Sequence, residues 1–376
     1  MSQNANTTSD TAPDSASQAT THSAKKTIVI VGGGSAGHVL PALPVADELI
    51  KKQWQVHFVG THSGLEEKLL GDRAITFHSV SAGKLRRYFS WQNFSDVIRI
   101  FLGIVQAMFL LRRIRPHVIF SKGGFVSFPI VFAGWLLRIP VVAHESDLTP
   151  GLANRLVMPF VSTLCSSFAD TRFAGFKGRV VNTGTPVRED LLNGDAAAGR
   201  LFLGVENGLP ILLVTGGSLG ADALNAIVRA SLPELCASYF VVHVCGPGKA
   251  KNLRQPGYLE LEYVDAGWGD MLAAADIVVS RAGANALFEL WALKKLTLLV
   301  PLSGAASRGD QLANAAYAKA QGLSEVVAEE DLGTEQLLIA LKTLRDNAPQ
   351  YQQALGGVTA LKASDSLVAE LEAVAK

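Results

Sequence analysis

Two glycine-rich turns in the chain could bind anions. Residues 32–37 read GGGSAG and residues 216–220 read GGSLG, and each follows a run of apolar, mostly β-branched residues and precedes a helical pattern. Backbone N–H groups in such a turn, together with the positive end of the helix behind it, can hold phosphate oxygens. The second turn is not a P-loop, because the GKS or GKT ending is missing. The alternative for both turns is a tight connection that only packs a helix on a strand.

The first turn also matches the G-x-G-x-x-G pattern of dinucleotide-binding folds, through Gly32, Gly34 and Gly37. Such a site needs an acidic residue near the end of the second strand to hold the ribose. The candidate second strand, residues 55–59, instead runs into residues 60–62 (GTH), which contain no acid. A nicotinamide or flavin site is therefore a weak hypothesis for this chain.

His38 lies at the tip of the first turn. A residue at the carboxyl end of a strand borders the ligand crevice of an open sheet, and imidazole titrates close to neutral pH. His38 is thus a candidate general base, and the competing interpretation is a structural histidine.

Further polar residues follow other candidate strands. Residues 121–124 read SKGG, residues 144–147 read HESD, residues 278–289 read VVSRAGANALFE and residues 301–315 read PLSGAASRGDQLANA. Carboxylates and amides suit sugar hydroxyls, because they accept and donate hydrogen bonds at fixed angles. A helix cap alone would explain Asp310, but the set as a whole predicts a polar cleft at the carboxyl edges of the sheets.

The composition disfavours several classes of protein. With 34 basic and 33 acidic side chains the formal net charge is +1, which provides no general attraction to nucleic acid. Cys165, Cys236 and Cys245 are far apart, so neither a disulfide framework nor a zinc site is expected, and a reducing compartment is favoured. No HExxH, Walker A or DxD pattern occurs, which disfavours zincin and NTPase chemistry and a metal-bound sugar nucleotide.

The glycine turns and polar segments need strands to position them. Apolar runs predict further strands at residues 55–59, 117–120, 141–143, 180–183, 240–244, 277–279 and 297–300. Helical patterns separate these runs, which favours parallel sheets. Two glycine turns that each open such a series predict an α/β chain with two Rossmann-like domains, whose parallel sheets face an interdomain cleft. Residues 183–190 (TGTPVRED) are the expected linker.

One segment predicts contact with a membrane surface. Residues 84–115 contain many basic residues and a single acid, Asp96. Basic side chains beside aromatic ones suit an anionic bilayer. The apolar run 97–111 is too short to span a membrane, and a buried helix with a charged rim is the alternative for it. The residues expected at the lipid surface are Leu85, Arg86, Arg87, Tyr88, Phe89 and Trp91.

The first residues of the chain carry a different pattern. Residues 1–25 are rich in Ser, Thr, Asn, Ala and Gln and contain no apolar core. This composition predicts a disordered tail rather than a signal peptide or a strand.

The motifs together resemble those of the MurG family of bacterial cell-wall glycosyltransferases over residues 26–327. The segments that carry the resemblance are, in chain order, GGGSAGHVLPAL, SKGGFVSFP, HESDLTPGLANRL, TGTPVRED, VTGGSLGA, SRAGANALFEL and SRGDQLANA. The resemblance implies the GT-B fold. It makes residues 26–185 an acceptor-binding and membrane-associating domain and residues 186–376 a UDP-GlcNAc-binding domain, whose last helix can pack back on the first.

The resemblance also implies an activity. The family transfers N-acetylglucosamine (GlcNAc) from UDP-GlcNAc to the C4 hydroxyl of the muramyl sugar (MurNAc) of lipid I. The product is lipid II, a precursor in peptidoglycan synthesis, and the anomeric carbon is inverted. Carried over by position, the contacts with UDP-GlcNAc fall on Ser35, Ala36, Gly37, Asp147, Arg188, Ser218, Val264, Gly283, Ala284, Asn285, Ala286, Leu287, Phe288, Glu289, Asp310 and Gln311.

Some of these positions have an implied role. Val264 would contact the base, Glu289 would hold the ribose hydroxyls, and Gln311, with Asp310 beside it, would bind the sugar hydroxyls. Two positions depart from the family. Residues 35–37 read SAG where the family usually has TGG, and Asp147 stands where it often has Asn.

His38 and Asp147 are both candidates for the general base. The implied partners are UDP-GlcNAc, lipid I and the anionic surface of the cell membrane on its cytoplasmic side. No cofactor, bound metal or nucleic acid is expected. The alternatives are another GT-B lipid glycosyltransferase of the diacylglycerol type, a UDP-GlcNAc 2-epimerase, an oxidoreductase and a non-catalytic membrane-binding module.

Overall fold

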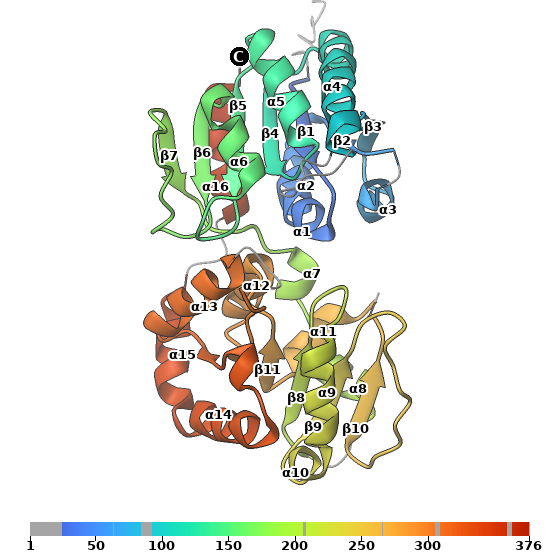
Figure 1. The fold of residues 1–376 in the computed structure, drawn as a ribbon, viewed down its shortest axis with the longest axis vertical. Coiled ribbons are helices and arrows are strands. Elements are labelled where there is room, and N and C mark those ends of the chain that lie inside the picture. The colour runs from blue at the N-terminus through green and yellow to red at the C-terminus, as the bar shows by residue number, and fades with distance from the viewer. Residues whose placement is uncertain are drawn as a thin grey trace, which may run out of the picture.

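The computed structural model describes residues 25–62, 64–83, 92–205, 208–264, 266–304, 309–358 and 363–375; for residues 92–95 only the backbone is described. The chain forms two α/β domains, which lie one above the other in Figure 1. Residues 183–188 connect the last strand of the first domain to the first helix of the second.

The first domain is built on a parallel sheet that has seven strands in the described part of the chain. The strands are β1 (Thr27–Gly32), β2 (Gln55–Gly60), β3 (Ile75–Ser79), β4 (Val118–Gly123), β5 (Val141–Glu145), β6 (Thr163–Ser166) and β7 (Arg179–Asn182). The helices are α1 (Ala36–Val39), α2 (Leu43–Lys51), α3 (Glu66–Leu70), α4 (Gln92–Ile114), α5 (Ser127–Leu136) and α6 (Leu152–Val157), with the 3-10 turns η1 (Leu40–Ala42) and η2 (Met158–Phe160).

The alternation of side chains along the strands explains why helices cover both faces of this sheet. Successive residues of a strand point to opposite faces. Ile28 and Ile30 of β1 pack on one face with residues of α2 and of the last helix, whereas Val29 and Val31 pack on the other with residues of α4 and α5. A strand with apolar side chains on both faces must be buried on both sides. Every residue of β1 is buried accordingly.

The second domain repeats this design around a six-stranded parallel sheet. Its strands are β8 (Ile211–Thr215), β9 (Phe240–Val244), β10 (Tyr258–Leu261), β11 (Ile277–Ser280), β12 (Leu296–Leu299) and β13 (Glu325–Val326). Its helices are α7 (Glu189–Leu192), α8 (Ala196–Leu203), α9 (Asp222–Ala230), α10 (Leu232–Cys236), α11 (Trp268–Ala274), α12 (Ala284–Ala292), α13 (Asp310–Ala320), α14 (Thr334–Asp346) and α15 (Ala348–Gly356), with the 3-10 turn η3 (Glu329–Asp331).

Both sheets have the strand order of a Rossmann fold. The orders are β3-β2-β1-β4-β5-β6-β7 and β10-β9-β8-β11-β12-β13. The order reverses between β1 and β4 and between β8 and β11, and open α/β sheets bind ligands at such switch points, outside the carboxyl ends of the strands. The glycine turns follow β1 and β8, so both lie where this rule places a ligand. The predicted fold class, two Rossmann-like domains with parallel sheets, is confirmed.

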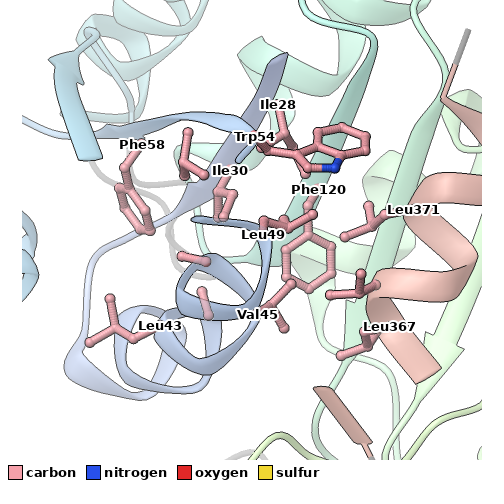
Figure 2. Packing of buried hydrophobic residues seen from close by; sticks show 14 of the residues in the cluster. Ile28, Ile30, Leu43, Val45, Leu49, Trp54, Phe58, Phe120, Leu367 and Leu371 are labelled. Atoms are coloured by element: carbon pink, nitrogen blue, oxygen red, sulfur yellow. The ribbon is translucent and has the colours of Figure 1, made fainter. Parts of the chain in front are cut away.

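The last helix, α16 (Ala363–Val374), belongs to the core of the first domain. Leu367 and Leu371 are fully buried in one cluster with Ile28, Ile30 and Trp54. Figure 2 shows the two leucines pointing from α16 toward the sheet. The chain therefore passes between the domains twice, once through residues 183–188 and again between α15 and α16.

Helix α4 has one buried face and one exposed apolar face. Ala107 and Leu111 are buried against the sheet. The exposed apolar side chains are Val97, Ile98, Phe101, Leu102, Val105 and Phe109. A simple buried helix with a charged rim therefore does not describe residues 97–111, because apolar side chains rather than charges fill much of the outer face.

Two further predictions fall largely outside the described residues. These are the tail at residues 1–25, of which only Lys25 is described, and the lipid-surface residues Leu85, Arg86, Arg87, Tyr88, Phe89 and Trp91. Among the helices that the structure does describe, none has the length and apolar character needed to cross a bilayer.

Candidate active site

Residues of both domains line a cleft of about 1310 Å³. The carboxyl ends of β1, β8 and β11 reach it through the loops that follow them. The cleft lining includes eight of the residues expected to contact UDP-GlcNAc: Ala36, Gly37, Arg188, Ser218, Val264, Asn285, Ala286 and Glu289. Residues that lie far apart in the sequence thus meet in one cavity between the two sheets.

The first glycine turn holds the histidine that we consider as a base. His38 Nδ1 lies 2.9 Å from Ser35 Oγ. When Nδ1–H donates to this hydroxyl, Nε2 carries the lone pair that a general base needs. The ring lies beside the end of β4, since a Cβ built on Gly123 would be 3.6 Å from His38 Nε2.

The sequence analysis missed an acid that caps the first turn. Glu66, at the start of α3, is buried, and its Oε1 accepts a hydrogen bond from the Gly34 N–H at 3.0 Å. The Thr61 hydroxyl donates to the same carboxylate. A carboxylate thus occupies one N–H group of the first turn, so the two turns that were expected as possible anion sites differ in the donors they offer. The position of Glu66, a few residues after the second strand, was the available signal.

The second glycine turn is open toward the cleft. Ser218 is exposed and lines the cavity, and the turn leads into α9. The Gly220 N–H donates to Gly217 O at 2.9 Å, which closes the turn. Gly220 has a φ of +68°, and a Cβ there would lie only 1.9 Å from Cys245 O. Glycine is therefore required at position 220 for both conformation and space.

Two polar atoms in the cleft have no hydrogen-bond partner among the described residues. They are Arg188 Nε, in the linker, and Asn285 Oδ1, at the start of α12. The Asn285 amide also crosses the cleft, because its Nδ2 donates to Gly37 O at 2.8 Å. Buried polar groups are nearly always paired, so a donor and an acceptor left over in one cavity indicate a polar ligand.

Glu289 lies one turn after Asn285 on α12. Burial raises the pKa of its carboxyl to about 7, with Arg188 opposing this shift and Asp190 adding to it. A carboxyl of this kind can accept from a hydroxyl when ionised and donate to one when protonated. This chemistry suits a ribose diol.

Three of the predicted contact positions on α12 have side chains that pack in the domain core. Ala284 and Leu287 are buried in a core cluster. Phe288 packs against Phe168 and Trp291, with ring centroids 5.0 and 5.1 Å away. Their side chains point into the domain because α12 is amphipathic, whereas Asn285, Ala286 and Glu289 of the same helix line the cleft. Gly283, the residue that precedes α12, is also outside the described cleft lining.

Asp147 joins the two domains. Its Oδ1 accepts from Asn314 Nδ2 at 3.1 Å, and Asn314 Oδ1 accepts from the Leu148 N–H at 3.0 Å. Asn314 lies on α13 and is fully buried. Motif reading located both residues but did not pair them.

The remaining predicted residues do not line this cleft. They are Ser35, His38, Asp147, Asp310 and Gln311. Asp310 and Gln311 begin α13. Gln311 Oε1 accepts from the Leu302 N–H at 2.9 Å. In this arrangement Gln311 fixes the loop after β12.

Lys122, at the end of β4, is buried and contacts His144 and Ser146. Its Nζ lies 2.6 Å from both His144 Nδ1 and Ser146 Oγ. His144 Nε2 lies 2.9 Å from the carbonyl of Gly184 in the linker. A carbonyl only accepts, so Nε2 carries the proton and Nδ1 accepts from Lys122. Burial lowers the pKa of Lys122 to about 7 and that of His144 well below its usual range.

The described residues contain no group of three or more His, Cys, Asp and Glu side chains that could hold a metal ion.

Two doubly wound domains around a polar cleft, with a glycine turn at each switch point, define the class of GT-B glycosyltransferases. Solved structures with this fold include MurG from Acinetobacter baumannii, with a TM-score of 0.72 and 24% identity over 93% of this chain and 99% of that chain. UDP-GlcNAc 2-epimerase from Neisseria meningitidis has a TM-score of 0.63 and 16% identity over 93% of this chain and 100% of that one. These identities establish the fold alone.

The chain belongs to glycosyltransferase family 28, whose N-terminal domain model matches residues 28–165 and whose C-terminal domain model matches residues 211–367. It is 44% identical over 350 residues to a Clostridium kluyveri protein, covering 92% of this chain and 99% of the relative. A Legionella pneumophila protein is 44% identical over 345 residues, 91% of this chain and 95% of the relative. Both relatives are named UDP-N-acetylglucosamine–N-acetylmuramyl-(pentapeptide) pyrophosphoryl-undecaprenol N-acetylglucosamine transferase.

Proposed function

We propose that the chain transfers GlcNAc from UDP-GlcNAc to the C4 hydroxyl of the MurNAc of lipid I and thereby forms lipid II. The observation that carries this proposal is the 44% identity to transferases of that name along 92% of the chain and nearly their whole length. The cleft between the domains supports it, because the residues needed for a nucleotide sugar meet there.

The donor binds in the second domain. Its ribose lies against Glu289, its uracil near Val264 and its diphosphate at the second glycine turn, where Ser218 and Arg188 both line the cleft. The first turn is unsuited to the diphosphate, because the carboxylate of Glu66 already occupies the Gly34 N–H and would repel a second anion. Backbone N–H groups and the end of α9 then stabilise the charge that develops on the departing UDP, without a metal ion.

The acceptor binds against the first domain. A second cavity of about 600 Å³ opens beside the first turn, and Ser35, Thr61, Glu66 and Phe125 are among the residues that line it. The C4 hydroxyl attacks C1 of the donor from the side opposite UDP, which inverts that carbon.

We assign the general base to His38 rather than Asp147. Ser35 can hold the His38 ring in the tautomer with a basic Nε2. The Asp147 carboxylate is instead engaged with Asn314 across the domain boundary. Asp147 then keeps the domains in register, and its interaction with the donor sugar is secondary.

We also propose that the enzyme is peripheral to the cytoplasmic face of the cell membrane. The exposed apolar side chains of α4 would rest on the bilayer, and Arg112, Arg113 and Arg115 at the end of the helix are exposed and complement anionic lipid. This placement brings the first domain to the lipid-linked acceptor.

The test measures UDP release from UDP-GlcNAc, in the presence of a chelator, with and without a soluble lipid I analogue. We expect release only with the analogue, and His38→Ala to lower kcat by about 10²–10⁴-fold. Asp147→Ala should cost about tenfold, the value of a lost hydrogen bond. His117→Ala, at the amino edge of the same sheet, is the control and should remain close to wild type.

Each alternative has its own outcome in this assay. An epimerase would turn over the donor without any acceptor, and a diacylglycerol glycosyltransferase would release UDP with diacylglycerol instead of the lipid I analogue. Wild-type turnover by His38→Ala would overturn the base assignment, and loss of turnover in chelator would overturn the metal-independent mechanism.

A further inference from the structure

A chain of buried polar side chains runs through the second domain behind the second glycine turn. It starts at Asn225 on α9, continues through His243 on β9 to Tyr258 and Glu260 on β10, and ends at Arg229, one turn along α9 from Asn225. Asn225 is 1% exposed and His243 is 0% exposed. Burial of so many polar groups is costly unless they are fully paired, and none of them lines the cleft as described.

The direction of the hydrogen bonds around Asn225 follows from chemistry. Asn225 Nδ2 donates to Cys245 O at 2.8 Å, so its Oδ1 is the atom that faces His243 Nε2 at 2.9 Å, and Nε2 must then carry the proton. The Tyr258 hydroxyl lies 2.9 Å from His243 Nδ1 and 3.0 Å from Glu260 Oε1, and its single proton can be donated to only one of them at a time. Burial lowers the pKa of His243 to about 4, with Arg229 adding to the shift and Glu260 opposing it. The ring is therefore neutral near pH 7 and held in one tautomer.

The carbonyl of Cys245, which accepts from Asn225, packs directly against the glycine turn. A Cβ on Gly220 would lie 1.9 Å from Cys245 O, and one on Gly246 would lie 2.7 Å from Leu219 O. These distances mean that the turn and the end of β9 are in direct backbone contact. A shift of Cys245 O would displace the turn as well.

A second connection reaches the same turn from the other end of the chain. Arg229 donates to Glu260 at 2.7 Å and to Lys249 O at 2.6 Å, which holds the loop after β9. Lys249 Nζ in turn lies 2.9 Å from Asp222 Oδ1, at the start of α9, and 3.5 Å from Gly220 O. Two independent routes thus lead from the buried chain to Gly220.

We infer that His243, acting through Asn225 and Cys245 O, is a positioning residue that fixes the second glycine turn for the diphosphate of the donor. The inference rests on the proposed function, because it takes that turn as the diphosphate site. Neither His243 nor Asn225 touches the donor. Their effect is to keep the backbone N–H groups of the turn in place before the ligand arrives, which saves the free energy of ordering the turn on binding.

The test compares two replacements of His243 that differ in which ring nitrogen they imitate. His243→Gln places an amide near the position of Nε2 and can still donate to Asn225 Oδ1, whereas His243→Asn is too short to do so. Tyr258→Phe removes the hydroxyl that lies against both His243 Nδ1 and Glu260 Oε1. Tyr351→Phe is the matched control, since its hydroxyl also donates to a glutamate of the second domain, Glu325, at 2.7 Å.

UDP affinity is measured by calorimetry on each folded variant, and donor KM, acceptor KM and kcat are measured in the UDP-release assay. We expect His243→Asn to weaken UDP binding and raise the donor KM about tenfold, the effect of one lost buried hydrogen bond. Tyr258→Phe should shift both in the same direction. His243→Gln and Tyr351→Phe should stay close to wild type, and acceptor KM should not change.

Failure of this inference is distinguishable from failure of the proposed function. Equal UDP affinity in wild type and His243→Asn would overturn the positioning role of His243. Equal losses in His243→Gln and His243→Asn, or an equal rise in acceptor KM, would also overturn it and indicate a general loss of structure. A wild-type enzyme that binds no UDP would instead contradict the proposed function itself.

Discussion

Some ionisable side chains of this enzyme are buried close to the boundary between the two domains. Lys122 is the clearest case, because its amine is enclosed between His144 and Ser146 instead of facing water. Loss of hydration destabilises the ammonium group more than the nearby carboxylates stabilise it, so the pKa of Lys122 falls from 10.5 to about 7. The same side chain supports His144, which holds Gly184 of the linker. A residue that can lose its charge near neutral pH thus lies next to the connection between domains.

This pKa predicts a dependence of stability on pH. Between pH 7 and about 10 the unfolded chain keeps a proton on Lys122 that the folded protein has lost, so the free energy of unfolding rises with pH, by up to about 1.4 kcal/mol per pH unit. Lys122→Met removes this contribution. The unfolding free energy of wild type minus that of Lys122→Met, measured by urea titration, should therefore increase from pH 7 to pH 10.

Lys177→Met, at an exposed position, serves as the control and should show a constant difference from wild type. A flat difference for Lys122→Met as well would mean that Lys122 does not titrate in this range.

At the scale of elements, α4 is unusual because it is apolar on both sides. Its inner face packs on the sheet through Ala107 and Leu111, whereas Phe101 and Phe109 are 65% and 70% exposed on its outer face. Monomeric soluble proteins rarely expose a contiguous apolar patch of this kind without a function for it. The exposed basic residues at the end of the helix fit the proposed contact with an anionic bilayer.

We predict that Phe101→Ser and Phe109→Ser, made together, weaken binding to vesicles that contain phosphatidylglycerol. Each buried aromatic side chain contributes about 1.5–3 kcal/mol, so the loss of both should reduce the partition coefficient at least tenfold. Sedimentation with vesicles measures it, and kcat on a soluble acceptor should not change. Leu201→Ser, an 84% exposed leucine of the second domain, is the control. Unchanged binding by the double variant would argue against α4 as the lipid-contacting element.

Sequence patterns predicted most of the strands with continuous apolar runs but missed strands in which polar side chains interrupt the run. The runs before both glycine turns, residues 55–59 and residues 240–244, are strands β1, β8, β2 and β9 as expected. Four strands were missed: β3, β6, β10 and β13. They span two to five residues and include polar side chains, such as His78 in β3 and Glu260 in β10, so neither alternation nor a continuous apolar run identifies them. Their pairing partners in the sheet decide their structure.

At the scale of the whole molecule, a few hydrogen bonds hold the two domains in register. Asn314 contacts both Asp147 and Leu148, and Asn285 contacts Gly37 across the cleft. Each such bond contributes about 0.5–1.5 kcal/mol, so the three together can shift the balance between closed and open arrangements by about one to three orders of magnitude.

Replacement of Asn314 tests how far these bonds favour the closed arrangement of the domains. Asn314→Asp places a second carboxylate against Asp147, and Asn314→Ala removes both bonds. We expect a larger radius of gyration without donor, more so for Asn314→Asp, and a kcat reduced about tenfold. Small-angle scattering measures the radius. The control is Asn347→Ala, which removes a hydrogen bond from the Asn347 side-chain amide to Thr343 O within one domain. This variant should leave the radius of gyration unchanged. The same radius in Asn314→Asp and wild type would contradict a role in closure.

Sequence motifs predicted several of the residues that line the cleft but none of the pairs that cross it. Ser218, Glu289 and Arg188 were expected there from the resemblance of their motifs to a family, and all three line the cleft. The contact between Asp147 and Asn314, and that between Glu66 and the first turn, depend on how separate segments pack. No local pattern encodes that arrangement, since it follows from the whole set of buried apolar contacts.

The position of α16 has a consequence for synthesis of the protein on the ribosome. The apolar core around Ile28 and Trp54 needs Leu367 and Leu371, which are translated after the whole second domain. Residues 25–182 therefore emerge with part of their hydrophobic interior uncovered while the second domain is still being made. A nascent chain that stops before α16 would display that surface to proteases and chaperones, so the cell can recognise the incomplete product by its exposed interior.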